Sequence, residues 1–446
     1  MGYNIGMVSL GCDKNRVDAE IMLSILAKEG HKLVTDPKNA DVIIVNTCGF
    51  IDSAKEESIN TILEMSENKD SGKCKSVIVT GCMAERYKDE LMGEIPEIDA
   101  IVGTGTYRQI AEIVTKTLNG ESGIVSTGSI NYDLDYEKRI LSTPSHYGYV
   151  KIAEGCNNKC SYCIIPRLRG RFRSRQMDGI VQEVKDLTEQ GVKEIILVAQ
   201  DTTKYGKDIY GERKLPELIK ELEKIDDLKW IRIMYSYPED VTDELIETIA
   251  NSSKACRYFD IPIQHISDNI LEGMRRTTSK NEILTLLNKI KTKMPDAIIR
   301  TSLIVGFPGE TQEDFEELRE LIQMNILDRV GIFTYSPEDG THAATLCNQI
   351  DDDTKEKRKN TLMQIQSVNS LENNKKLEGT VMKVLIEGKS DNNQYFGRTY
   401  QDAPSIDQNV YVNSSIEINP GDIVSVKIQK AYTYDLIGDV DNEFSK

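Results

Sequence analysis

The feature that most constrains the fold of this chain is a repeated alternation of short apolar runs with helical patterns. In the first part of the chain, apolar runs at residues 4–10, 41–45 and 76–79 are separated by helical stretches such as residues 16–29. Strands that alternate with helices form a parallel sheet that the helices cover. The sequence therefore predicts an α/β fold that begins with a Rossmann-like parallel-sheet domain at residues 1–120.

A second alternating series begins near Gly148, after a polar segment at residues 119–144 that we predict to be a linker. Its strand candidates are residues 149–153, 194–198, 230–234, 258–262, 297–304 and 329–335. Six strands with intervening helices predict a partial (β/α)6 barrel of the TIM type. A charged helical segment at residues 351–376 closes this barrel, so we expect the second domain at residues 142–376.

The pattern changes again after residue 377. Here the strand candidates are residues 380–386, 394–400, 409–412 and 423–431. Turn signals such as Pro420-Gly421 separate these runs, and no helical pattern intervenes. Short strands joined by turns predict a small antiparallel β-barrel, which we place at residues 378–446.

Nine cysteines and a net charge of −17 limit the kinds of function. Apolar runs such as residues 195–199 are too short to span a bilayer, and the N-terminus lacks the pattern of a signal peptide, so we expect a cytoplasmic protein with no membrane association. In that reducing compartment, cysteines serve metal binding or catalysis more often than disulfides. The acidic charge disfavours simple electrostatic binding to nucleic acid and favours a basic protein partner.

Three cysteines with C-x₃-C-x₂-C spacing, Cys156, Cys160 and Cys163, follow the first strand of the predicted barrel. Three thiolates on one short loop can hold three irons of a cubane and leave the fourth iron open, as a reactive site requires. A zinc knuckle is the alternative, but zinc needs four ligands and the only nearby candidate is His146. The spacing therefore favours a reactive iron–sulfur cluster at the mouth of the barrel.

Polar residues and glycine follow the other strands of the predicted barrel. Gln200, Ser236 and Gln264 come after the second, third and fourth strands, and a Gly306-Phe-Pro-Gly-Glu310 segment comes after the fifth. Barrels place their ligand contacts at the carboxyl ends of the strands, and glycine permits a close backbone approach. We expect these five residues to include contacts to a cofactor or a substrate.

A second set of cysteines, Cys12, Cys48 and Cys82, lies in the N-terminal domain. Each follows the last apolar residue of a predicted strand by two or three positions. Because equivalent ends of parallel strands lie side by side, we expect the three thiols to converge on a second cluster with an open iron. The alternative is that they are ordinary buried cysteines. The remaining cysteines lack this placement, and we expect them to be dispensable: Cys74, Cys256 and Cys347.

The barrel motif, with Tyr162 before its last cysteine, resembles the radical-SAM superfamily. The order of the three predicted domains resembles the methylthiotransferase family, which ends in a TRAM domain. Within that family, the resemblance to the RimO branch is carried by Asn46-Thr-Cys-Gly-Phe-Ile-Asp-Ser-Ala-Lys-Glu-Glu-Ser58, Ala199-Gln-Asp-Thr-Thr203, Asp260-Ile-Pro-Ile-Gln-His265, Gly397-Arg-Thr-Tyr-Gln-Asp-Ala-Pro-Ser-Ile-Asp407 and Tyr434-Asp-Leu436.

This resemblance implies a function and its cofactors. The two cysteine sets would each hold a 4Fe–4S cluster, and S-adenosylmethionine would bind the open iron of the barrel cluster with help from the strand-end residues. Cleavage of S-adenosylmethionine to a 5′-deoxyadenosyl radical would then allow a methylthio group to be placed on the β-carbon of an aspartate. The implied substrate is small-subunit ribosomal protein S-twelve, either free or in the subunit. The implied enzyme is a monomer that takes electrons from a donor such as flavodoxin or ferredoxin.

Two alternatives remain at this point: a tRNA methylthiotransferase of the MiaB type, and a non-catalytic iron–sulfur protein that binds RNA. Residues 378–446 contain 6 Lys and Arg against 11 Asp and Glu, a net charge of −5. An acidic terminal barrel suits a basic ribosomal protein better than tRNA, so we expect carboxylates such as Asp402 and Asp407 to contact it. Five arginines in the loop from Arg167 to Arg175 indicate a solvated face, or a site for an acidic group such as the target aspartate.

Overall fold

The N-terminal domain is built on a six-stranded sheet in which all neighbouring strands are parallel. The computed structural model describes residues 2–132, 134, 136–390 and 393–441. The sheet has the order β2-β1-β3-β4-β5-β6. Its strands are β1 (Asn4–Ser9), β2 (Lys32–Val34), β3 (Val42–Thr47), β4 (Ser76–Gly81), β5 (Ala100–Val102) and β6 (Ile124–Ser126).

Helices cover this sheet, and β3 and β4 are buried along their whole length. The helical elements are α1 (Asp13–Lys28), η1 (Pro37–Asn39), α2 (Asp52–Ser66), α3 (Asn68–Ser71), α4 (Cys82–Arg86), α5 (Lys88–Glu94), η2 (Tyr107–Gln109) and α6 (Ile110–Leu118). The sequence did not predict β2, β5 or β6, because each has only three residues and carries no measurable periodicity. The segment predicted to be a linker therefore contributes β6 to the sheet.

The second domain is a partial barrel of six parallel strands, as predicted. β7 (Tyr147–Lys151), β10 (Glu194–Val198) and β11 (Trp230–Ile233) form one sheet, and β12 (Tyr258–Asp260), β13 (Ile298–Val305) and β14 (Arg329–Thr334) form the other. A parallel bridge between Ile231 and Ala255 joins the two sheets. β8 (Ala153–Glu154) and β9 (Arg173–Ser174) form a short antiparallel pair beside the cysteine loop.

Helices surround the barrel, and two of them, α13 and α14, begin with capping boxes in which a side chain at each end of the first turn satisfies a backbone N–H. The helical elements are α7 (Ile165–Arg169), α8 (Met177–Glu189), η3 (Thr202–Lys204), α9 (Lys207–Tyr210), α10 (Leu215–Glu223), η4 (Pro238–Asp240), α11 (Asp243–Asn251), α12 (Asp268–Gly273), α13 (Lys280–Lys293), α14 (Gln312–Gln323), η5 (Ala343–Thr345) and α15 (Asp352–Lys375). Within the described residues, no helix combines the length and apolar character needed to cross a membrane.

The C-terminal domain is a closed five-stranded barrel of order β15-β16-β17-β19-β18. Its strands are β15 (Val381–Lys389), β16 (Tyr395–Arg398), β17 (Asn409–Asn413), β18 (Ile423–Ala431) and β19 (Asp435–Val440). Neighbouring strands are antiparallel except β17 and β19, which close the barrel in parallel. The sequence did not predict β19, because Gly438 and two aspartates interrupt its apolar pattern.

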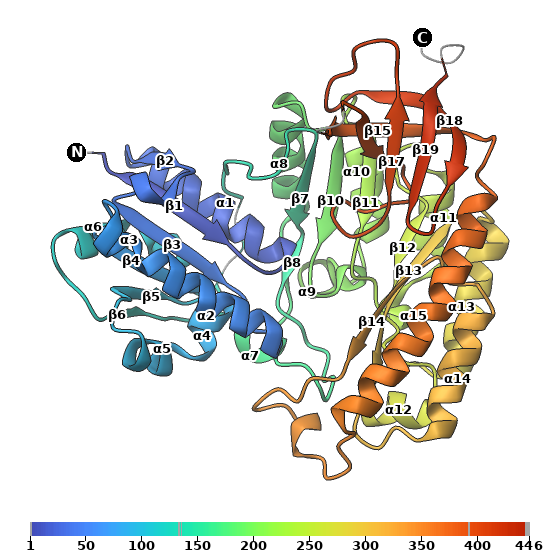
Figure 1. Ribbon diagram of the computed structural model, residues 1–446, viewed down its shortest axis with the longest axis horizontal. Coiled ribbons are helices and arrows are strands. Elements are labelled where there is room, and N and C mark those ends of the chain that lie inside the picture. Colours follow the sequence, from blue (N-terminus) through green and yellow to red (C-terminus); the bar gives the residue numbers. More distant parts are fainter. Residues whose placement is uncertain (1, 133, 135, 391–392, 442–446) are drawn as a thin grey trace.

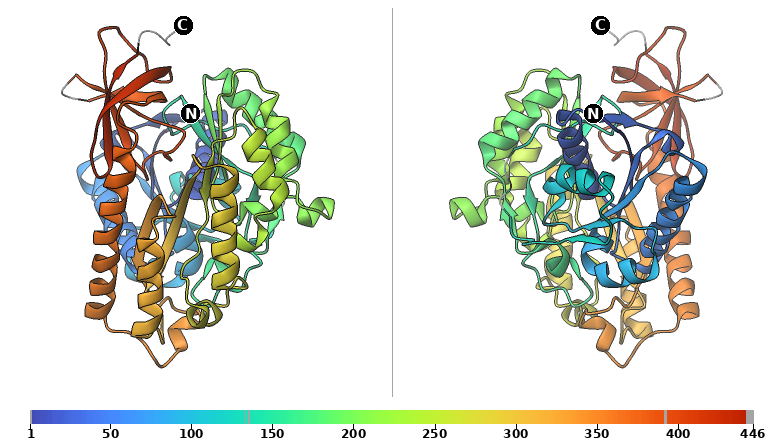
Figure 2. Two further views of the ribbon diagram at one scale, coloured as in Figure 1. Left: turned by 90° about the vertical axis from the view of Figure 1, so that its right-hand side faces the viewer. Right: turned by 90° about the vertical axis from the view of Figure 1, so that its left-hand side faces the viewer.

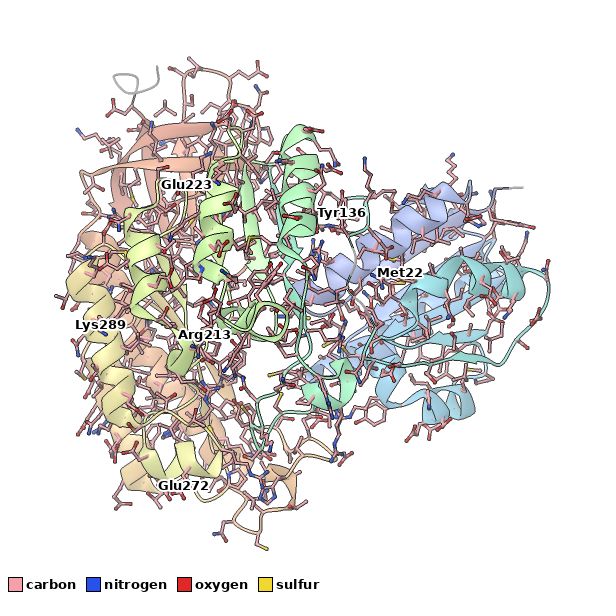
Figure 3. The ribbon with its side chains drawn as sticks, turned by 180° about the vertical axis from the view of Figure 1, so that it is seen from behind. Met22, Tyr136, Arg213, Glu223, Glu272 and Lys289 are labelled. Carbon is pink, nitrogen blue, oxygen red and sulfur yellow. The ribbon has the colours of Figure 1, made fainter. Side chains whose placement is uncertain are left out.

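The three domains pack against one another through α1 and the terminal barrel. Val17 and Ile21 of α1 share a core with Tyr149 of β7 and Ile196 of β10. Figure 1 shows the N-terminal domain in blue beside the barrel, and Figure 2 shows the red terminal barrel above α15. In the view from behind, Tyr136 lies on the segment that joins the first two domains, and its hydroxyl bonds to Asp186 of α8 (Figure 3). This arrangement brings the carboxyl ends of the strands of the N-terminal sheet toward the carboxyl ends of the barrel strands.

Asp402 and Asp407 lie in the contact between the terminal barrel and the partial (β/α)6 barrel. Asp402 is only 2% exposed and pairs with Arg329 of β14 at 2.9 Å. Asp407 accepts hydrogen bonds from the hydroxyl of Tyr258 at 2.5 Å and from the backbone N–H of Ala403. The prediction that these two carboxylates contact a partner is wrong, since both are used to hold the terminal barrel in place.

Candidate active site

The barrel cysteines lie on the loop between β8 and α7, at the carboxyl end of β7. Cys156 and Cys160 are buried and Cys163 is half-buried. Burial raises the pKa of the Cys156 thiol to about 11 and that of the Cys163 thiol to about 12, and each thiol senses the charge of its neighbours. Such thiols ionise near neutral pH only if a metal replaces the proton. The loop therefore brings three thiols close together, and a metal that bound them would have to displace their protons.

Two side chains that the sequence analysis missed lie against this loop. The hydroxyl of Tyr237 is 3.8 Å from Cys160 Sγ, and the guanidinium of Arg276 lies 4.3 Å from the centre of the Tyr237 ring. Among the described residues, Arg276 Nε and Nη1 have no hydrogen-bond partner although they are buried. Arg276 therefore places a positive charge, with free donors, beside the cysteine loop. In the sequence, only the position of Arg276 after the fourth barrel strand could have indicated that it lies beside the cysteine loop.

The structure brings three of the predicted contact residues to adjacent strand ends. Gln200 donates from Nε2 to Glu154 at 2.6 Å, and its Oε1 is buried without a partner among the described residues. Ser236 is buried, and its N–H donates to the carbonyl of Asp260 at 2.8 Å. Gln264 has a φ of 71° and bridges to Leu303 of β13. Gln200 is linked through Glu154 to the segment that carries Cys156.

Glu310 serves mainly to shape its own loop. Its carboxylate accepts hydrogen bonds from the backbone N–H groups of Gly306 and Phe307, and it pairs with Arg358 of α15 at 3.1 Å. Burial raises the pKa of the Glu310 carboxyl to about 7, while these partners oppose the rise. The side chain thus fixes the turn that begins at Gly306.

The N-terminal cysteines follow the ends of three adjacent strands, as the sequence predicted. Cys12 caps α1 after β1, Cys48 follows β3, and Cys82 begins α4 after β4. The glycines before Cys12 and Cys82 allow close packing: a Cβ at Gly11 would lie 2.8 Å from Cys48 Cβ, and one at Gly81 would lie 2.4 Å from the Thr47 carbonyl oxygen. Burial raises the pKa of the Cys82 thiol to about 11, with the charges of Cys12 and Cys48 adding to the rise. The three thiols therefore lie near one another.

A buried network of charges joins the two sets of cysteines. Arg169 lies 3.4 Å from Cys82 Sγ and 3.3 Å from Glu154, and it also pairs with Asp18 of α1. Lys151 of β7 pairs with the same two carboxylates, at 2.6 Å from Glu154. Since Glu154 lies two residues before Cys156, one network connects the N-terminal thiols to the barrel loop.

The arginine-rich loop is thus only partly a solvated face. Arg169 and Arg175 are buried, and Arg175 pairs with Glu183 at 2.6 Å and donates to the carbonyl of Lys151. Arg171 is exposed, as a solvated face predicts. The acidic groups that the loop holds in this structure belong to the chain itself.

A second set of ion pairs joins the same two domains. Glu338, in the segment that follows β14, is buried and pairs with Lys55 of α2 at 3.0 Å and with Arg86 of α4 at 2.9 Å. Arg86 also donates to the carbonyl of Gly49, next to Cys48. The strand ends that carry the cysteines are therefore tied to the barrel on two sides.

In the described part of the chain, no three His, Cys, Asp or Glu side chains are placed to hold one metal ion. The three other cysteines lie elsewhere: Cys74 donates to the carbonyl of Ser76, Cys256 is buried near Arg232, and Cys347 is exposed.

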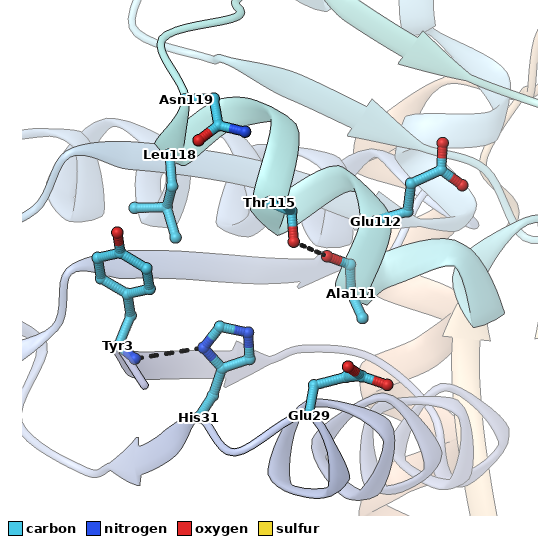
Figure 4. A pocket seen from close by; sticks show the side chains of 8 residues that line it. All are labelled: Tyr3, Glu29, His31, Ala111, Glu112, Thr115, Leu118 and Asn119. Atoms are coloured by element: carbon cyan, nitrogen blue, oxygen red, sulfur yellow. Dashed lines mark hydrogen bonds between the residues drawn. The ribbon is translucent and has the colours of Figure 1, made fainter. Parts of the chain in front are cut away.

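A cavity of about 500 Å³ lies away from both cysteine sets, between the start of β1, the end of α1 and α6 (Figure 4). Tyr3, His31 and Glu112 are among the residues that line it, and His31 Nδ1 accepts a hydrogen bond from the Tyr3 N–H. None of the cysteines borders this cavity. This cavity is therefore separate from the candidate site at the cysteines.

Three family models match successive parts of the chain: "Uncharacterized protein family UPF0004" over residues 4–103, the Radical SAM superfamily over residues 150–322 and the TRAM domain over residues 379–440. Among curated proteins, ribosomal protein uS12 methylthiotransferase RimO of Clostridioides difficile (strain 630) is 53% identical over 437 residues, which is 98% of each chain. The protein of the same name from Clostridium acetobutylicum is 51% identical over 442 residues, which is 99% of each chain.

Solved structures share the fold at low sequence identity. The radical S-adenosylmethionine methyltransferase TsrM from Kitasatospora setae, with cobalamin and a 4Fe–4S cluster bound, matches with a TM-score of 0.57 and 13% identity over 77% of this chain and 74% of that chain. The cobalamin-dependent S-adenosylmethionine radical enzyme OxsB matches with a TM-score of 0.51 and 13% identity over 81% of this chain and 56% of that chain. At these identities the likeness concerns the fold alone.

Proposed function

The chain belongs to the RimO family of ribosomal protein uS12 methylthiotransferases, within the radical SAM superfamily, and we propose that it transfers a methylthio group to the β-carbon of an aspartate in ribosomal protein uS12. The observation that carries this proposal is the identity of about half of all residues over nearly the whole length of both RimO relatives. Membership in the superfamily implies S-adenosylmethionine and a 4Fe–4S cluster.

Two clusters, held by independent ligand sets, are part of this proposal. Cys156, Cys160 and Cys163 would hold the barrel cluster, and Cys12, Cys48 and Cys82 would hold the second. The support for the second is the placement of its cysteines: they follow the ends of three adjacent strands, their thiols interact electrostatically, and Arg169 lies 3.4 Å from Cys82 Sγ. When bound, the barrel cluster and S-adenosylmethionine supply a radical that removes a hydrogen atom from a carbon too weakly acidic for a side-chain base.

The protein's own residues bind the cofactor and exclude water. We propose that Gln200, Ser236 and Gln264 contact S-adenosylmethionine from adjacent strand ends, and that Gly306 contributes backbone contacts. The free buried oxygen of Gln200 supports this assignment, since an unpaired buried acceptor is costly without a ligand. Glu310 would act by holding the turn at Gly306 in shape.

The partners follow from the charge of the chain. Its net charge of −17 suits a basic ribosomal protein, either free or in the small subunit, better than tRNA. This favours the protein-modifying reaction over that of a MiaB-type enzyme and over a non-catalytic RNA-binding role. We further propose that the enzyme acts as a monomer in the cytoplasm and receives electrons from a donor such as flavodoxin or ferredoxin.

Mass spectrometry of ribosomal protein uS12 tests the proposal directly. The protein from cells that carry the gene should contain a methylthio group on one aspartate, and the protein from cells without the gene should lack it. Purified enzyme with iron, sulfide, S-adenosylmethionine, a reductant and a sulfur source should restore the modification in vitro. A preparation that modifies tRNA and leaves uS12 unchanged would refute the assignment of substrate.

A further inference from the structure

β14 is the last strand of the partial barrel and has a free edge. It pairs with β13 on one side, and the described residues supply no strand on its other side. Figure 1 shows it as the outermost strand of its half of the barrel, on the side of the N-terminal domain. The edge of a sheet presents unpaired backbone N–H and C=O groups that can pair with another chain. Proteins usually cover such an edge unless it has a use.

A groove of about 310 Å³ borders β14. Its lining includes Val330, Gly331 and Phe333 of β14, Met363 and Gln366 of α15, and Ile406 of the terminal barrel. The groove therefore receives residues from both faces of β14, as expected of a channel that follows the edge itself. Its walls are the last helix of one domain and a loop of another.

Large apolar side chains remain exposed around this groove. Phe333 is 50% exposed, Ile406 is 45% exposed and Tyr434 is 48% exposed, and all three border the same groove. They come from segments far apart in the sequence. A cluster of exposed apolar side chains beside a free strand edge is typical of a surface that a partner covers.

The charged residues of the groove are neutralised within the chain. Arg300 pairs with Asp260 at 2.6 Å, and Arg329 pairs with Asp402 at 2.9 Å. Asp328 pairs with Lys291 at 2.7 Å. A surface for nucleic acid needs cations that are free to meet phosphates. Backbone hydrogen-bonding groups and apolar side chains instead suit a polypeptide.

We infer that an extended segment of the protein substrate binds in this groove as an added strand along β14. In this mode of recognition, backbone hydrogen bonds give affinity and side-chain contacts give selectivity. The inference rests on the proposed function, since it requires a protein substrate. The direction of β14 supports it: the next residues, Ser336 and Glu338, contact Asp52 and Lys55 at the start of α2, close to Cys48. A segment bound along β14 would thus continue toward the strand ends that carry the N-terminal cysteines.

Hydrogen–deuterium exchange of the cluster-loaded enzyme tests this inference. Addition of isolated ribosomal protein uS12 should slow exchange of backbone amides of β14, because N–H groups on its free edge would then donate hydrogen bonds to the added strand. The amides of β15, in the closed terminal barrel, serve as the internal reference. Unchanged exchange in β14 at saturating uS12 would overturn the inference.

Two variants add a measurement of affinity. Phe333→Glu and Ile406→Glu should each raise the Kd for uS12 about tenfold or more, because a carboxylate in an apolar contact must lose its hydration. Ile416→Glu is the matched control, since Ile416 is 52% exposed on the terminal barrel and does not line the groove. All three should form deoxyadenosine at the wild-type rate without substrate. Equal affinities in all three variants would overturn the inference.

The outcomes separate this inference from the proposed function. If the wild-type enzyme modifies uS12 but β14 gains no protection, the inference fails and the proposed function stands. If the wild-type enzyme neither binds nor modifies uS12, both fail. If tRNA protects β14 while uS12 does not, a polypeptide is the wrong occupant.

Discussion

Replacement of Arg169 by methionine should destabilise the contact between the N-terminal domain and the barrel more than any surface substitution. Arg169 is 3% exposed, and in its network two cations, Lys151 and Arg169, balance two carboxylates, Asp18 and Glu154. Arg169→Met leaves both carboxylates to one cation. Removal of one partner from a buried ion pair costs about 3–5 kcal/mol, against about 0–1 kcal/mol for an exposed pair.

A second change in the same network isolates the charge effect. Arg169→Met with Asp18→Asn restores equal numbers of cations and carboxylates, so the double variant should recover stability relative to the single one, by about 1–3 kcal/mol of coupling. Urea unfolding followed by the fluorescence of Trp230, the only tryptophan, measures the free energy of unfolding. Arg171→Met, on the exposed part of the same loop, is the control. A decrease of less than about 1 kcal/mol in the free energy of unfolding of Arg169→Met, or a double variant less stable than the single one, would refute the reasoning.

Four further predictions follow from the structure. Replacing Cys156, Cys160 and Cys163 by Ala should remove about half of the iron and abolish deoxyadenosine formation, and replacing Cys12, Cys48 and Cys82 should remove the other half; full iron content in the second variant would disprove the N-terminal site. Ser at Cys74, Cys256 and Cys347 should leave both clusters in place, with a packing loss of about 1–3 kcal/mol, and loss of a cluster from the folded variant would contradict this. Burial lowers the pKa of His265 from 6.5 to about 3. The neutral ring accepts a hydrogen bond from the Ser267 N–H. The contribution of the neutral His265 ring to the free energy of unfolding is therefore complete above pH 6.5 and is lost as the pH falls. Between pH 6.5 and about pH 5 the wild type should lose about 2 kcal/mol more than His265→Asn in urea titrations, and parallel pH profiles would argue against that cause. Asp402→Asn should expose the chain near residues 376–380 to limited proteolysis at any salt concentration, because its partner Arg329 is buried; an effect that disappears at high salt would instead indicate a role in surface charge.

The placement of the N-terminal cysteines was predictable because it follows from local pattern. Cys12, Cys48 and Cys82 each lie just after an apolar run that ends a strand, and parallel strands place such ends together. Barrel strands with a continuous apolar run were predictable from that run: residues 194–198 were predicted with the bounds that β10 has. In contrast, β6 has three residues, and its pairing with β5 is a tertiary contact that no periodicity reports.

The partners of charged residues could not be predicted. Arg169 and Asp18 are far apart in the sequence, and nothing in the arginine-rich loop distinguishes Arg169 from Arg171, which is exposed. The same holds for Asp402, whose position in an acidic domain indicated a surface charge until the fold placed it against Arg329. Net charge is a property of composition, whereas burial of a given carboxylate depends on the packing of two domains.

The charged residues buried between the two cysteine sets help to fix the distance between those sets. Apolar contacts between α1 and the barrel, such as Val17 and Ile21 against Tyr149, stabilise the contact but are not directional. The proposed transfer of a group between two sites would need a fixed distance between them, since small displacements of reacting groups cost large factors in rate. The ion pairs of Arg169 and Glu338 have directional geometry and lie on two sides of the cysteines. Their desolvation is costly. Their directional geometry fixes the distance between the two cysteine sets, which apolar contacts alone would hold less firmly.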